Sequence, residues 1–220
     1  MIRRVYEQAK ECNELSEVIV ATDDPRIEKH VSEFGGKVMM TSEHHNSGTE
    51  RCSEVCLNLR KAGQEFDMIV NIQGDEPYIH PEQITELLGC FNAAGVQIAS
   101  LMKKIISREE LNSPDVVKVV TDTYGRALYF SRATIPFVRG REKEEWLESH
   151  SFYKHIGIYG YRPDVLLRIV KLPVSAHEKA ESLEQLRWLD NGFEVILKET
   201  VHESLAIDVP ADLLKLTNRE

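Results

Sequence analysis

The sequence predicts an α/β protein with a mainly parallel central sheet and helices on both of its faces. Apolar stretches with strand character alternate with amphipathic helical stretches through the first hundred residues. Such alternation is typical of parallel strands joined by helices. A hairpin pattern follows, in which two strand-like runs flank the turn sequence Thr123-Tyr124-Gly125.

Turn-forming residues mark the expected elements of the first half. Asp24 and Pro25 are typical of a helix start, and Gly35-Gly36 of a helix end. Pro81 opens a later helix, which Gly95 closes. Helices are expected at residues 1–12, 23–34, 48–62 and 81–93, and strands at residues 18–22, 37–41, 66–73 and 96–102.

The second half is expected to continue without a break into a separate domain. It contains no repeat, no low-complexity tract and no long linker, so residues 1–220 are predicted to form a single domain. Its charged stretch, residues 139–148, is expected to be an exposed connection. Strands are expected at residues 116–120, 127–131, 152–161 and 193–199, and helices at residues 163–170, 176–190 and 210–216.

Length and charge narrow the class of protein. A chain of 220 residues with 42% hydrophobic residues can form one sizeable core. Its net charge of −9 argues against a general nucleic-acid or anionic-membrane surface. It has no run approaching the roughly 20 apolar residues of a membrane span. Its four cysteines suggest free thiols, not a disulfide framework. A cytoplasmic protein is the resulting expectation.

Two aspartates are the strongest candidates for chemistry. Asp75 follows an apolar run that ends at Gly74, and Asp208 occupies a similar strand-to-helix setting far along the chain. In open α/β sheets, ligands bind at the carboxyl ends of strands. Carboxylates placed there can hold a divalent cation against a polyphosphate. The alternative for Asp75 is a turn or helix-capping residue.

Seven segments, taken in order, resemble the 3-deoxy-manno-octulosonate cytidylyltransferases. Any one of them is a weak signal, but the ordered set from about residue 1 to about residue 216 is highly specific. The segments are ATD at 21–23, HNSGTER at 45–51, QGDEP at 73–77, ALYFSRATIP at 127–136, HIGIYGY at 155–161, LEQLR at 183–187 and IDVP at 207–210.

The resemblance implies a Rossmann-like nucleotidyltransferase fold, with a small β-hairpin dimerisation region at about residues 116–160. Members of that family join CTP and 3-deoxy-D-manno-octulosonate (Kdo) to give CMP-Kdo and pyrophosphate, for lipopolysaccharide biosynthesis. The resemblance also implies Mg²⁺ as cofactor and a homodimer as the assembly.

Site residues follow from the same motifs. By resemblance, Asp75 and Asp208 are the catalytic magnesium ligands, and Ser47, Gly48 and Asp75 border the nucleotide. The expected Kdo-binding residues are Gln73, Arg132, His155, Tyr159, Glu184 and Gln185.

Each of these side chains also has an ordinary structural interpretation. Arg132 can form a surface ion pair, and His155 can be a core histidine bonded to backbone. Glu184 and Gln185 can be solvated residues of a helix. Tyr159 can be a core or rim aromatic residue.

The chain departs from the family pattern at its start. Family members begin with a strand and a Pro-Ala-Arg…Arg-Leu-Pro-Gly-Lys loop that holds the triphosphate, whereas Met1 here begins the following helix. A shortened sequence or a misplaced start is the expected explanation. The alternatives to a CMP-Kdo synthetase are another sugar-acid cytidylyltransferase, such as a CMP-sialic acid synthetase, or a catalytically impaired fragment that lacks the CTP-binding loop.

Overall fold

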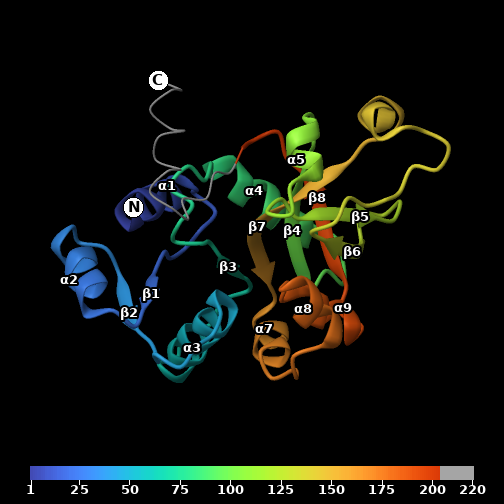
Figure 1. The fold of residues 1–220 in the computed structure, drawn as a ribbon. Helices are drawn as coiled ribbons and strands as arrows, with labels where there is room; N and C mark the ends of the chain where they lie inside the picture. Colours follow the sequence, from blue (N-terminus) through green and yellow to red (C-terminus); the bar gives the residue numbers. More distant parts are fainter. Residues whose placement is uncertain (204–220) are drawn as a thin grey trace. The chain divides into compact units, whose positions relative to one another are not determined.

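The computed structural model describes residues 1–203 and divides into two compact units (Figure 1). Of the described residues, the first unit comprises Met1–Thr85 with His202 and Glu203, and the second comprises Glu86–Val201. Helices and strands alternate as predicted, so the α/β class is confirmed. Asp208 and the helix expected at residues 210–216 lie outside the described residues. Within residues 1–203, no helix has both the length and the apolar character needed to cross a membrane.

The first unit contains a parallel pair of strands, β1 and β2, in which Val20 lies opposite Val38. The chain crosses between them through α2. The cap predicted for this helix is confirmed, because the Arg26 backbone N–H donates to Asp24 Oδ1 at 2.8 Å. The elements are α1 (Ile2–Glu11), β1 (Val20–Thr22), α2 (Pro25–Glu33), β2 (Val38–Met40), α3 (Gly48–Lys61), β3 (Ile69–Asn71) and α4 (Pro81–Gly89), which crosses the division.

The second unit is built on strands in the order β6-β5-β7-β4-β8. β4 and β8 are parallel, whereas the pairs β4–β7, β5–β7 and β5–β6 are antiparallel. The predicted hairpin is the β5–β6 pair. The elements are η1 (Cys90–Asn92), β4 (Ile98–Lys104), α5 (Arg108–Asn112), β5 (Lys118–Thr121), β6 (Ala127–Ser131), η2 (Lys143–Glu145), α6 (Trp146–Ser149), β7 (Tyr153–Tyr161), α7 (Pro163–Ile169), α8 (Ala176–Glu181), α9 (Gln185–Asp190) and β8 (Val195–Glu199).

An irregularity in the β4–β7 ladder shapes the centre of this sheet. Ser100 lies opposite Tyr159, but the next residue of β4 lies opposite Ile156. The two residues of β7 between these partners therefore bulge out of the regular pairing. Gly160 follows the bulge, and a Cβ there would lie 2.7 Å from Phe91 Cε2. The close approach of a ring to the backbone thus requires glycine.

The charged stretch at residues 139–148 corrects one prediction. It was expected to be exposed throughout, yet Trp146 is buried and begins helix α6. Its ring packs in a core cluster with Ile105, Leu111 and Phe152. A single large apolar side chain anchors this stretch, because burial of one indole outweighs the polar character of its neighbours.

The helix expected at residues 176–190 is two helices, α8 and α9, which lie with α7 in the orange part of Figure 1. The break occurs at Ser182, whose backbone is left-handed with φ of 54°. Leu183 N–H still bonds to Glu178 O at 3.3 Å, so the first helix ends in a hydrogen-bonded turn. The apolar spacing of a helix continues through the break, which is why the sequence pattern did not reveal it.

Candidate active site

The nucleotide group, defined as Ser47, Gly48 and Asp75, lies in the first unit. Ser47 caps α3, because its hydroxyl accepts a hydrogen bond from Glu50 N–H at 3.2 Å. Gly48 is the first residue of this helix. The N-terminus of a helix attracts anions, because its first N–H groups and the helix dipole favour negative charge. This end of α3 therefore has the chemistry that a phosphate requires.

Gly48 also lets the start of α3 lie close to the last residue of β3 and to the chain that follows it. A Cβ at Gly48 would lie 3.4 Å from Asn71 Nδ2 and 3.5 Å from Gln73 Oε1. Asn71 is buried, so this contact is part of the packing of the first unit. Gln73, expected to bind the sugar, thus lies beside Gly48, expected to border the nucleotide.

Asp75 occupies a turn two residues after Gln73 and is partly buried. It follows the carboxyl end of β3, as the sequence predicted. Its carboxylate supplies hard oxygen ligands, the type that Mg²⁺ prefers. Asp208, its expected partner, lies outside the described residues, so the meeting of the two carboxylates stays a prediction.

The sugar group, defined as Arg132, His155, Tyr159, Glu184 and Gln185, lies in the second unit. His155 and Tyr159 both come from β7, and their ring centroids are 5.1 Å apart. The Tyr159 hydroxyl is buried and has no hydrogen-bond partner among the described residues. Burial, together with the nearby Glu184 carboxylate, raises the pKa of Tyr159 well above its ordinary value. A buried hydroxyl without a partner suits a ligand that supplies one.

Glu184 and Gln185 lie at the start of α9. The Glu184 carboxylate accepts from Arg187 Nη2 at 3.2 Å, and Glu178 accepts from the same nitrogen at 3.0 Å. Gln185 is buried, so its interpretation as a solvated helix residue is wrong. The Glu184–Arg187 pair holds the carboxylate in a defined orientation beside Tyr159.

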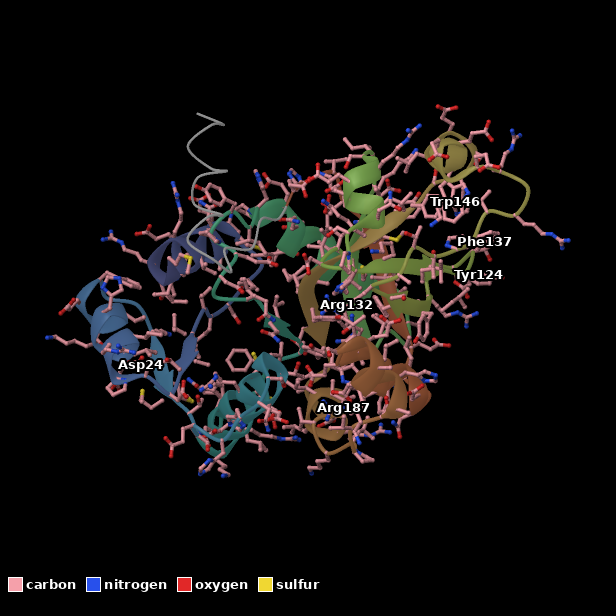
Figure 2. The ribbon with its side chains drawn as sticks, in the orientation of Figure 1. Asp24, Tyr124, Arg132, Phe137, Trp146 and Arg187 are labelled. Atoms are coloured by element: carbon pink, nitrogen blue, oxygen red, sulfur yellow. The ribbon has the colours of Figure 1, made fainter. Side chains whose placement is uncertain are left out.

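Arg132, labelled in Figure 2, follows β6 and is held by backbone carbonyls. Its Nε donates to Glu181 O at 2.7 Å, and its Nη1 donates to Pro114 O at 3.1 Å. Its own backbone N–H donates to the Glu181 carboxylate at 2.9 Å. The surface ion-pair interpretation is therefore wrong, because the guanidinium donates to neutral carbonyls. They orient the cation without cancelling its charge.

A second cation lies near Arg132. Lys118 is fully buried, and its Nζ donates to Ser113 O at 2.7 Å and to Val116 O at 2.5 Å. Burial lowers the pKa of Lys118, and the positive charge of Arg132 lowers it further. The nearby carboxylates of Glu181 and Asp115 act on the pKa of Lys118 in the opposite direction, so the positive charge of the two basic side chains is partly balanced.

Sequence reasoning missed several residues that support the sugar group. Ser100 bonds to His155, and Glu181 binds the backbone of Arg132 and the hydroxyl of Ser131. No short motif contains either pair, because the partners lie 55 and about 50 positions apart. Lys118 carried no clear signal either, because a lysine in a strand can face solvent on the outer side of the sheet.

Comparisons with known proteins agree with this architecture. Residues 1–200 match the cytidylyltransferase family. A 3-deoxy-manno-octulosonate cytidylyltransferase of Parabacteroides distasonis is 52% identical over 98% of this chain and 85% of that protein. The corresponding protein of Cytophaga hutchinsonii is 50% identical over 99% of this chain and 86% of its own length.

Solved structures give the same result. A CMP:2-keto-3-deoxy-manno-octonic acid synthetase in complex with CTP has a TM-score of 0.87 and 43% identity, over 99% of this chain and 86% of that one. A putative glucose-1-phosphate thymidylyltransferase of Bacillus anthracis, with a TM-score of 0.63 and 15% identity over 99% of this chain and 80% of its own, shares the fold.

The fold is thus that of a nucleotidyltransferase. The match over residues 1–200 and the identities of 50–52% show that the chain belongs to the cytidylyltransferases, and among them to the 3-deoxy-manno-octulosonate cytidylyltransferase family.

Proposed function

We propose that this protein joins CTP and Kdo to give CMP-Kdo and pyrophosphate, for lipopolysaccharide biosynthesis. The observation that carries the proposal is the match of almost the whole chain to relatives with that name, at 50–52% identity. The relative solved with CTP, which shares the fold at a TM-score of 0.87, supports CTP as the nucleotide.

The nucleotide group receives the triphosphate. The start of α3 presents the positive end of its dipole to the phosphates, and Asp75 would hold Mg²⁺ with Asp208, its expected partner, which lies outside the described residues. The carboxylate at the end of β3 fits this cation, because Mg²⁺ selects hard oxygen ligands. When bound, the ion neutralises charge on the phosphates.

The sugar group receives Kdo. Arg132 is oriented by two carbonyls and can bind the substrate carboxylate through parallel hydrogen bonds. Tyr159 and Gln185 offer buried polar groups to the sugar hydroxyls, and the partly buried His155 and the Glu184 carboxylate lie in the same unit. A site with this many buried polar groups rejects analogues that leave them unpaired.

The reaction requires positioning more than covalent catalysis. The anomeric hydroxyl oxygen of Kdo attacks the α-phosphorus of CTP in line with the leaving group. A bond forms between that oxygen and the α-phosphorus, and the bond from the α-phosphorus to the bridging oxygen of pyrophosphate breaks. The hydroxyl proton is lost to solvent. The residues of this chain hold the two reactants and balance their negative charge.

Pyrophosphate release with CTP and different sugar acids tests the proposal. Release with Kdo and Mg²⁺, and the appearance of CMP-Kdo by mass spectrometry, are expected. Turnover of sialic acid without turnover of Kdo would replace the proposed substrate. Binding of Kdo without any pyrophosphate release would mean that this chain is not the complete enzyme.

We further propose a cytoplasmic homodimer, formed through the hairpin region of residues 116–160. Large apolar side chains are exposed there: Leu128 is 60% and Phe137 is 73% exposed. Sedimentation equilibrium should give twice the mass of one chain, and Leu128→Glu should shift the protein toward the monomer. A wild-type monomer at micromolar concentration would contradict the dimer.

A further inference from the structure

Ser100, which is buried, and His155, which is partly buried, form a pair at the bulge of the β4–β7 ladder. The Ser100 hydroxyl oxygen lies 2.9 Å from His155 Nε2. The same oxygen lies 2.7 Å from Ile158 O and 3.1 Å from Ile156 O. The bulge creates this geometry, because the ladder pairs Ser100 with Tyr159 and the next residue with Ile156.

The hydrogen bonds of this pair are consistent with only one placement of its protons. A serine hydroxyl has one proton to donate, and a carbonyl oxygen can only accept. Two carbonyl oxygens face the Ser100 hydroxyl, so its proton points to one of them. The Ser100 oxygen must then accept from His155, which places the imidazole proton on Nε2. The opposite arrangement would leave the hydroxyl oxygen 2.7 Å from Ile158 O without a hydrogen between them.

The second ring nitrogen of His155, Nδ1, is consequently an acceptor. Burial lowers the pKa of the imidazole to about 3, so the ring is neutral near pH 7 and Nδ1 keeps its lone pair. Nδ1 has no hydrogen-bond partner among the described residues, and the side chain is only partly buried. Phe130 and Tyr159 pack against the ring, with centroids at 5.1 Å from it, and limit its rotation.

We propose that Ser100 is a positioning residue that holds His155 with its proton on Nε2, so that Nδ1 accepts a hydrogen bond from a hydroxyl group of the sugar acid. This inference rests on the proposed function. It states that in the hydrogen bond between the sugar and His155 the sugar hydroxyl donates and Nδ1 accepts. A neutral acceptor favours a hydroxyl and disfavours a carboxylate, because two acceptors cannot share a hydrogen bond. The carboxylate of the substrate is thereby directed to Arg132.

The first test is the protonation of His155 in the unliganded wild-type protein. Long-range ¹H–¹⁵N NMR on the full chain with ¹⁵N-labelled histidine distinguishes the two neutral forms, and His155→Gln identifies the resonance. We expect a neutral ring with its proton on Nε2 at pH 7, and a change at Nδ1 on addition of Kdo. A proton on Nδ1, or a charged ring at pH 7, would overturn the inference whatever the catalytic activity.

The second test compares variants of Ser100. Ser100→Ala removes the acceptor that fixes the tautomer, so the KM for Kdo should rise about 3–10-fold, the value of one neutral hydrogen bond. The KM for CTP should stay unchanged. Ser100→Thr keeps the hydroxyl and suits a strand, so it should restore both the NMR signature and the KM for Kdo. Ser149→Ala is the matched control, because its exposed hydroxyl bonds only to backbone carbonyls of its own helical segment.

Different results would refute the role of Ser100 and the proposed function. A folded Ser100→Ala protein with an unchanged KM for Kdo would remove Ser100 from the role of positioning residue. A wild-type protein that never releases pyrophosphate with Kdo would refute the proposed function, and would do so without altering the protonation seen by NMR.

Discussion

The nucleotide group and the sugar group are built in different ways. In the first unit, the candidate residues lie at element ends: Ser47 caps a helix, Gly48 begins it, and Asp75 follows a strand. In the second unit, His155 and Tyr159 lie inside the longest strand, and Gln185 lies in a buried part of α9.

This difference bears on how each group can act. The start of a helix binds phosphate through backbone donors, which almost any sequence supplies. A buried sugar pocket depends on particular side chains and on the partners that orient them. We therefore expect changes in the nucleotide group to affect turnover, and changes in the sugar group to affect recognition.

The largest effect is expected from Asp75→Asn. It keeps the shape of the side chain but removes a metal-ligand charge, so kcat should fall about 100-fold or more at saturating Mg²⁺. The KM for Kdo should change little, as measured by pyrophosphate release.

Asp24→Asn is the control for that experiment. Asn caps a helix as well as Asp does, and the ion pair that is lost, Asp24–Arg26, lies in the same unit. Near-normal turnover of Asp75→Asn would mean that the two units do not divide binding and catalysis in this way.

Arg132→Lys is expected to have a smaller effect, on the binding of Kdo and not on turnover. Lysine cannot form the forked contact with a carboxylate, so the KM for Kdo should rise about 10–100-fold while the KM for CTP stays constant. Steady-state kinetics with each substrate varied in turn measure this. Arg126→Lys, which alters an ion pair with Asp122 on the hairpin, should leave both values unchanged. An equal rise for CTP and Kdo would contradict the separation of the two groups.

The last effect concerns folding stability and pH, and leaves binding and turnover aside. Burial holds the pKa of His155 near 3, below its ordinary 6.5, so the unfolded chain binds more protons than the folded one between these values. Stability contributed by the neutral ring is therefore complete above about pH 6.5 and declines as the pH falls toward 3. His155→Gln should flatten the dependence of the unfolding free energy on pH in this window, as measured by urea denaturation. An unchanged slope would mean that the ring is not held neutral by burial.

Much of the fold could be predicted because local signals and tertiary structure agree. Asp24 and Pro25 mark the start of α2, Gly125 marks the hairpin, and the apolar runs mark the strands. The errors occurred where a distant partner decided the outcome. Trp146 is buried by residues from two other segments, and the left-handed turn at Ser182 follows from no local pattern.

The nucleotide group and the sugar group also differ in how far local sequence predicts them. The Ser47 cap could be predicted from neighbouring residues alone. The orientation of His155 could not, because it depends on a serine from another strand and on a bulge in the ladder. For Asp75 and Asp208, the sequence predicts a pair whose second member lies outside the described residues.

The left-handed backbone at Ser182 has a consequence for which substitutions this segment can accept. It lets the residue on one side, Glu181, hold the strand end at Arg132, while the residues on the other side start a new helix that carries Glu184. Small or side-chain-bonding residues such as Gly, Asn and Asp tolerate that conformation, whereas Val or Ile would strain it. A bulky branched residue at position 182 should therefore disturb the positions of Arg132 and Glu184 together.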